Sequence, residues 1–148
     1  MKIALGCDHA GFTLKNAVIA AIEQAGAEVL DFGTFSLESV DYPDYAQKAC
    51  AAVLAGEAEK GILICGSGVG IGIAANKIKG IYAATCHDTY SAHQGVEHDG
   101  MNVLCLGSRI IGSELAKEIV AAFIKAEFCE DERHIRRTGK VRQIEKNN

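Results

Sequence analysis

The sequence lacks the features that mark membrane-spanning and nucleic-acid-binding proteins. It has one proline and no tryptophan among 148 residues, and its formal net charge is −4. An acidic chain of this kind offers no broad basic surface, which argues against nucleic acid or an anionic membrane as a partner. No apolar run approaches the roughly 20 residues that cross a bilayer.

The six cysteines form no disulfide framework or zinc site that can be recognised from their spacing. There is no C-x-x-C pair and no zinc-ligand spacing among them. The chain opens directly on Lys2–Gly6, without a charged leader, a long apolar segment or a cleavage site. We therefore expect reduced thiols in a cytoplasmic protein, with no bound metal.

Short apolar runs alternate with longer amphipathic segments along the whole chain. Five runs are almost continuously apolar and bounded by glycine or aspartate, which is typical of parallel strands buried on both faces. These runs are Lys2–Gly6, Glu28–Phe32, Gly61–Cys65, Ile81–Cys86 and Asn102–Leu106. The segments between them show helical spacing. The pattern predicts one α/β domain, residues 1–148, with a five-stranded parallel sheet between helices.

A few local signals mark helix boundaries. Pro43 follows a turn-rich segment and suits the first turn of a helix, and Ser113 is placed to cap the helix that follows Gly112. The last segment, about 131–146, is rich in arginine and lysine. We expect it to form a helix that is too polar for the core.

Polar and titratable residues follow the ends of four predicted strands. The residues after the first, third, fourth and fifth strands are, in order, Cys7-Asp8-His9, Cys65-Gly66-Ser67, Cys86-His87-Asp88 and Gly107-Ser108-Arg109. In open parallel sheets, ligands bind outside the carboxyl ends of the strands. The sequence therefore predicts a functional site at this edge of the sheet.

The segment Cys65–Gly72 is the most informative part of the sequence. Its alternate glycines let the backbone turn tightly and present N–H groups to an anion, next to the positive end of the following helix. A dinucleotide fingerprint would need glycine in place of Ile71, and no Gly-Lys-Ser/Thr closes a Walker loop. We interpret the segment as an anion-binding loop. The alternative is a strand-to-helix turn that binds nothing.

Cys65 and His98 are the candidates for proton transfer. Cys65 lies at the mouth of a helix amino terminus, where its thiolate is stabilised and can act as a base or nucleophile. His98 is predicted in a loop before the fifth strand, where it can exchange protons near neutral pH. The alternatives are a buried strand-end thiol and a solvated loop histidine. His87 and His93 are expected at the surface.

The other candidates are polar groups suited to a sugar phosphate. Asp8 and His9 can orient or deprotonate a hydroxyl, although Asp8 can equally cap a helix. Arg109, Arg133 and Arg137 can make forked contacts to a phosphate, and the last two lie four residues apart on one helical face. The alternative for these arginines is a solvated basic surface.

Several segments, taken together and in order, resemble a known family over essentially the whole chain. They are Gly6–Phe12, Asp41–Pro43, Ile64–Ile71, Ala74–Lys77, Asn102–Leu104, Gly107–Arg109 and Arg133–His134. The family is type B ribose-5-phosphate isomerase together with the galactose-6-phosphate isomerase subunits. The resemblance implies a Rossmann-like α/β/α sandwich that forms homodimers or tetramers. It also implies a C-terminal helix that reaches the partner, and active sites that are shared between subunits.

The resemblance also implies an activity and a role for each candidate. The activity is the interconversion of ribose 5-phosphate and ribulose 5-phosphate in the pentose phosphate pathway, through an enediol and without metal or cofactor. Cys65 would take the proton beside the carbonyl, and His98, assisted by Asp8, would open the sugar ring. The enediolate would be stabilised by the Ser67 hydroxyl and by the backbone of Gly66, Ser67, Gly68, Val69 and Gly70. The phosphate would be held by His9, Arg109, Arg133 and Arg137, some of them from the other subunit.

Two positions depart from the family pattern. Asp99 stands where the family has an amide that can contact the substrate, and Val96 stands where an arginine is common. These departures bear on the preferred sugar. A galactose- or allose-type hexose 6-phosphate isomerase therefore stays open, as does a sugar-phosphate-binding module without catalysis. A redox role for Cys65 is a further alternative.

Overall fold

Five parallel strands form the middle layer of the structure, a computed structural model that describes residues 1–148. They are β1 (Lys2–Cys7), β2 (Glu28–Asp31), β3 (Lys60–Cys65), β4 (Ala83–Thr85) and β5 (Val103–Gly107). The order across the sheet is β2-β1-β3-β5-β4, and every neighbouring pair is parallel. Each predicted apolar run thus forms a strand, and the prediction of a parallel sheet is confirmed.

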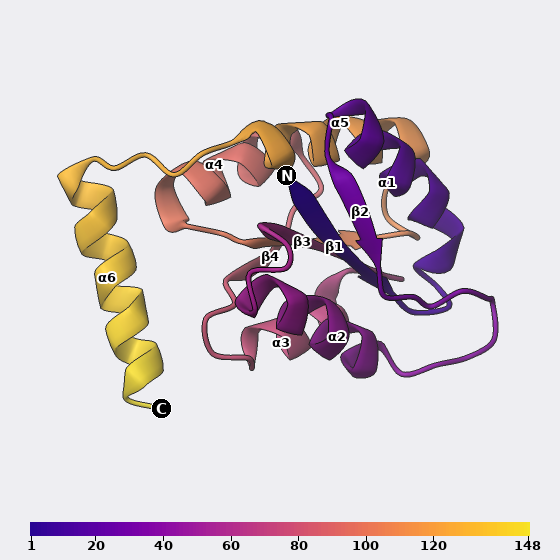
Figure 1. Ribbon diagram of the computed structural model, residues 1–148, viewed down its shortest axis with the longest axis horizontal. Coiled ribbons are helices and arrows are strands. Elements are labelled where there is room, and N and C mark those ends of the chain that lie inside the picture. The colour runs from indigo at the N-terminus through magenta and orange to yellow at the C-terminus, as the bar shows by residue number, and fades with distance from the viewer.

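Helices cover both faces of this sheet (Figure 1). One face carries α1 (Phe12–Gln24), α4 (Thr89–Asp99) and α5 (Ser113–Lys125), and the other carries α2 (Tyr42–Leu54) and α3 (Val69–Asn76). The last helix, α6 (Glu132–Lys146), stands apart from the three layers (Figure 1). None of the helices combines the length and the apolar character needed to cross a membrane.

Burial distinguishes the central strands from the edge strands. β1, β3 and β5 are buried along nearly their whole length, as expected for strands covered on both faces. For β2 and β4 this expectation was wrong, because both are partly exposed. Each lies at an edge of the sheet with a neighbour on one side only. An apolar run therefore indicates a strand but does not say whether that strand is central.

The predicted helix starts are partly correct. Pro43 lies in the first turn of α2, where its missing N–H costs no hydrogen bond. The prediction for Ser113 was wrong, because Gly112 occupies the cap position of α5 and no side chain there accepts a hydrogen bond. α6 begins at Glu132 and continues through Gly139.

Lys15 is a buried charge that joins α1 to the segment after β2. Its Nζ lies 2.7 Å from Oδ2 of Asp31 and donates to the carbonyl oxygen of Thr34, also at 2.7 Å. The ring of Phe35 packs over the same ammonium, with its centroid 4.1 Å from Nζ. This segment leads to α2 and to one wall of the site described below.

We expect Lys15→Met to lower the free energy of unfolding by about 2 kcal/mol, because the buried carbonyl oxygen of Thr34 loses its donor and the partly exposed Asp31 carboxylate loses its cation. Urea unfolding followed by circular dichroism measures the change. The control is Lys117→Met, which removes an exposed pair with Glu114 at 3.4 Å and should change stability by less than about 0.5 kcal/mol. Equal effects of the two substitutions would contradict the argument.

Candidate active site

The carboxyl ends of β1, β3 and β5 surround a cavity of about 380 Å³. Asp8 and His9 reach it from the end of β1, Cys65 and Ser67 from the end of β3, and Arg109 from the end of β5. The structure therefore brings together candidates that are widely separated in the sequence. It does so because parallel strands end at one edge of the sheet.

Cys65 is the last residue of β3 and is 5% exposed. Its Sγ accepts a hydrogen bond from the backbone N–H of Gly68 at 3.1 Å. Gly68 has a φ of +78°, a left-handed conformation that glycine adopts without strain. The sulfur therefore faces the amino terminus of α3, where backbone N–H groups carry partial positive charge.

Four other cysteines are buried in surroundings that disfavour the charged thiolate. Burial raises the pKa of Cys7, Cys50 and Cys86 to about 11, so these groups remain thiols at neutral pH. Burial also raises the pKa of Cys105. All six cysteines are free. Of the strand-end cysteines, Cys65 is the one that opens onto a cavity beside a helix amino terminus.

The loop after Cys65 lies closely against two other side chains. A Cβ placed on Gly66 would lie 3.0 Å from Nη1 of Arg109, and one on Gly70 would lie 2.9 Å from Cζ of Tyr42. An anion bound at this loop would therefore sit between a guanidinium group and a phenol ring. Sequence reasoning did not select Tyr42 as a site residue, although it belongs to the Asp41–Pro43 segment that carries the family resemblance.

Asp8, His9 and Ser67 each make a local contact that orients the side chain. Oδ1 of Asp8 accepts the N–H of Gly11 at 2.9 Å and closes the turn before α1, but the cap position of that helix is Gly11 and no side chain caps it. Nδ1 of His9 accepts the N–H of Val40 at 3.1 Å, which leaves the Nε2 proton of the neutral ring available to an anion. Oγ of Ser67 accepts the N–H of Val69 at 3.2 Å.

His98 lies near the amino-terminal ends of the strands, on the side of the sheet opposite to the carboxyl ends that surround the cavity with Cys65. α4 follows the carboxyl end of β4 and runs back, so its last turn lies near the start of β5. The prediction that His98 lies in a loop was wrong, because α4 continues to Asp99 and ends at Gly100, whose φ is +68°. His98 therefore does not line the cavity that contains Cys65 in the same chain.

The start of α6 packs against the end of α4. The N–H of Cys129 donates to the carbonyl oxygen of Glu97 at 2.8 Å, and the ring of His134 stacks on that of His98 with 4.2 Å between centroids. Arg133 and Arg137 belong to the same first turns of α6. The predicted site residues thus form two groups within one chain. One group lines the cavity with Cys65, and the other, with His98, lies at the junction of α4 and α6.

His134 is also part of a cluster of potential metal ligands. One atom each from Cys129, Asp131 and His134 lie within 4.8 Å of one another. Nη2 of Arg133 lies 3.8 Å from Oδ2 of Asp131, so a positive charge already faces this carboxylate. This is the group of side chains best placed to hold a metal, and it lies at the opposite edge of the sheet from Cys65.

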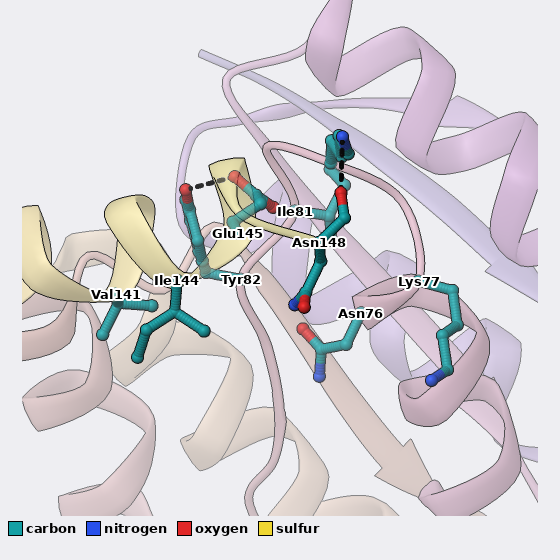
Figure 2. A pocket seen from close by; sticks show the side chains of 9 residues that line it. Asn76, Lys77, Ile81, Tyr82, Val141, Ile144, Glu145 and Asn148 are labelled. Atoms are coloured by element: carbon teal, nitrogen blue, oxygen red, sulfur yellow. Dashed lines mark hydrogen bonds between the residues drawn. The ribbon is translucent and has the colours of Figure 1, made fainter.

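The largest cavity, about 540 Å³, also lies away from Cys65. Figure 2 shows it between the C-terminal half of α6 and residues 76–82. The Tyr82 hydroxyl donates to Oε2 of Glu145 at 3.0 Å, and the N–H of Gly80 donates to Oε1 of the same carboxylate at 2.9 Å. These contacts anchor the end of α6, and the cavity contains none of the predicted site residues.

The sequence matches the family model described as Ribose/Galactose Isomerase over residues 3–141. The chain belongs to this family. The predicted family is therefore confirmed, and the reaction class of the family is isomerisation.

Individual relatives match the chain over most of its length. Ribose-5-phosphate isomerase B of Escherichia coli (strain K12) is 51% identical over 144 residues, which cover 97% of this chain and 96% of that protein. D-erythrulose-4-phosphate isomerase of Pectobacterium atrosepticum is 44% identical over 129 residues, which cover 86% and 85%. The structure of Clostridium thermocellum ribose-5-phosphate isomerase B superimposes with a TM-score of 0.94 at 49% identity, over 99% of both chains. The predicted three-layer fold is confirmed by this superposition.

Proposed function

We propose that this chain interconverts ribose 5-phosphate and ribulose 5-phosphate by moving one proton between adjacent carbons. The observation that carries the proposal is Cys65, whose Sγ faces the Gly68 N–H in a cavity that also contains His9 and Arg109. The names of several close relatives support the choice of substrate.

In the proposed reaction the Cys65 thiolate takes the proton from C2 of the open-chain aldose. Negative charge then develops on the former carbonyl oxygen and gives an enediolate. At the start of α3 the N–H of Val69 donates to Oγ of Ser67, whereas the N–H of Gly70 has no partner within the helix and can stabilise that charge. A proton then moves from the hydroxyl oxygen on C2 to the oxygen on C1, and the Cys65 thiol returns its proton to C1, which gives the ketose.

We place the phosphate at the other end of the substrate. His9 can donate from Nε2, and Arg109 can make a forked contact beside the glycine-rich loop. Binding the phosphate fixes the reacting carbons against the thiolate, so that binding energy contributes to the rate. The six free cysteines fit a reducing compartment, and we place the activity in the cytoplasm.

We further propose that a second copy of the chain completes each site. His98, Asp99, Arg133 and Arg137 lie at the sheet edge opposite Cys65, so only another chain can bring such groups to its cavity. α6 stands apart from the body of the protein and exposes Ile135, Val141 and Ile144 (Figure 1). Exposed apolar side chains that cluster on one element are typical of an interface.

Proton NMR of ribose 5-phosphate with the purified protein and EDTA in deuterated water tests the reaction. We expect ribulose 5-phosphate to appear, with deuterium from the solvent at the carbon beside the carbonyl. Absence of turnover would refute the pentose assignment. D-erythrulose 4-phosphate and hexose 6-phosphates are the next substrates to try, and binding without turnover of any of them would favour the binding-module alternative.

Mixing two inactive variants tests whether the sites are shared. A heterodimer of Cys65→Ala and His98→Asn contains one site with both substitutions and one with neither, if each site uses Cys65 of one chain and His98 of the other. Refolding the variants together at equal amounts should restore about one quarter of the wild-type activity, because about half the dimers are mixed and each has one intact site. Light scattering measures whether the assembly is a dimer or a tetramer. No recovery of activity would contradict shared sites.

A further inference from the structure

Two histidines on α4 each contact, through Nδ1, a side chain four residues away, and the two partner groups differ in chemistry. Nδ1 of His93 lies 3.0 Å from Oε2 of Glu97, and Nδ1 of His98 lies 3.0 Å from Nε2 of Gln94. Both pairs are four residues apart on one helix, so the two contacts differ chiefly in the group that faces the ring. This difference determines where each neutral ring carries its proton.

A carboxylate can only accept a hydrogen bond, so Nδ1 of His93 must carry a proton to make its contact with Glu97. The amide nitrogen of Gln94, rather than its oxygen, faces Nδ1 of His98, and an amide nitrogen only donates, so Nδ1 is the accepting nitrogen of this contact. The single proton of a neutral His98 ring is then on Nε2. The two rings are predicted to be opposite tautomers on the same helix.

We propose that Gln94 is a positioning residue that holds His98 as the Nε2–H tautomer, so that this ring presents a hydrogen-bond donor to the sugar. The inference rests on the proposed function, in which His98 takes part in opening the sugar ring. A donor at Nε2 stabilises the negative charge that develops on the ring oxygen as its bond to the anomeric carbon breaks. A bare Nε2 would instead repel that oxygen.

The stacking of His134 on His98 restrains the same ring in a second direction. The two planes differ by 14°, and His134 is 3% exposed. The stack restrains the plane of the His98 ring. The contact with Gln94 sets which ring nitrogen accepts a hydrogen bond and which one donates.

Nitrogen-15 NMR of the histidine rings tests this inference without relying on turnover. Two-bond proton–nitrogen correlations, recorded near pH 8 where ordinary histidines (pKa ~6.5) are neutral, distinguish the two tautomers. In the wild-type protein we expect Nε2–H for His98 and Nδ1–H for His93. Gln94→Glu should convert His98 to the Nδ1–H tautomer and lower kcat for ribose 5-phosphate by about tenfold, with little change in KM.

Glu97→Gln is the matched control, because it makes the reverse exchange in the other pair. It changes only the group that faces His93, so the His98 tautomer and kcat should stay as in the wild type. An Nδ1–H signal for His98 in the wild-type protein would overturn the inference, as would an unchanged His98 tautomer in Gln94→Glu. If the wild-type protein shows the expected tautomers but isomerises no sugar phosphate, the proposed function fails and the role of Gln94 in orienting the ring stands.

Discussion

Cys65→Ala should lower kcat for ribose 5-phosphate by about 10³-fold or more, while the affinity for the sugar phosphate stays close to that of the wild type. The expected loss is large because the thiolate is the only base proposed for the proton on carbon, and removing a positioned base costs about 10²–10⁴-fold in rate. Binding should persist, since His9 and Arg109 do not depend on the sulfur. NMR turnover measures kcat, and isothermal titration calorimetry measures affinity.

Cys50→Ala is the matched control for this experiment. Cys50 is 1% exposed on α2, and burial raises the pKa of its thiol to about 11, so it takes no part in proton transfer. Its replacement should leave kcat unchanged at a small cost in stability. Appreciable turnover by Cys65→Ala would contradict the assignment of the base. Full turnover combined with selective oxidation of Cys65 would favour the redox alternative.

Gly11→Ala should lower the free energy of unfolding by about 3 kcal/mol, the upper end of the range for overpacked sites. A Cβ at this position would overlap the carbonyl oxygen of Ile64 and lie 2.5 Å from its carbonyl carbon. Because these are backbone atoms of the central strand β3, no side-chain rotation relieves the overlap. The same carbonyl oxygen accepts the N–H of Asp8 at 3.2 Å, so any shift also disturbs the site.

The midpoint of urea unfolding measures this effect, and Gly139→Ala provides the comparison. A Cβ on Gly139 meets no atom within 4 Å, and alanine is favoured over glycine in a helix interior by about 1 kcal/mol. Gly139→Ala should therefore be neutral or stabilising. A wild-type midpoint for Gly11→Ala would show that α1 and β3 separate easily at this contact.

The features that depend on short stretches of chain could be predicted from the sequence. The run Gly61–Cys65 predicts a buried strand because its apolar residues are continuous, and the glycines that follow predict a tight turn into a helix. Both are present in the structure, with Cys65 ending β3 and Gly68 in a left-handed conformation. Pro43 could be placed in a first helical turn because proline lacks the N–H that such a turn leaves unpaired. Family membership followed from combining these local motifs.

The structure was needed wherever contacts between distant segments decide the outcome. The sequence did not show that β2 and β4 are edge strands, since the order of the sheet depends on which strands pair across long connections. Tyr42 enters the site because α2 packs against the glycine-rich loop, and this contact depends on the packing of two segments that lie far apart in the sequence.

The position of His98 shows the same division between local and tertiary information. Its residue type predicts proton transfer, and the resemblance assigns it to the site. Only the fold shows that α4 carries it to the edge opposite Cys65, next to α6. By itself, the sequence determined the strands, most of the helices, the glycine-rich loop and the chemical character of the candidate residues, because each depends on neighbours along the chain. Only the tertiary structure decided which candidates share a cavity, because the order of the strands and the direction of each helix bring them together or keep them apart.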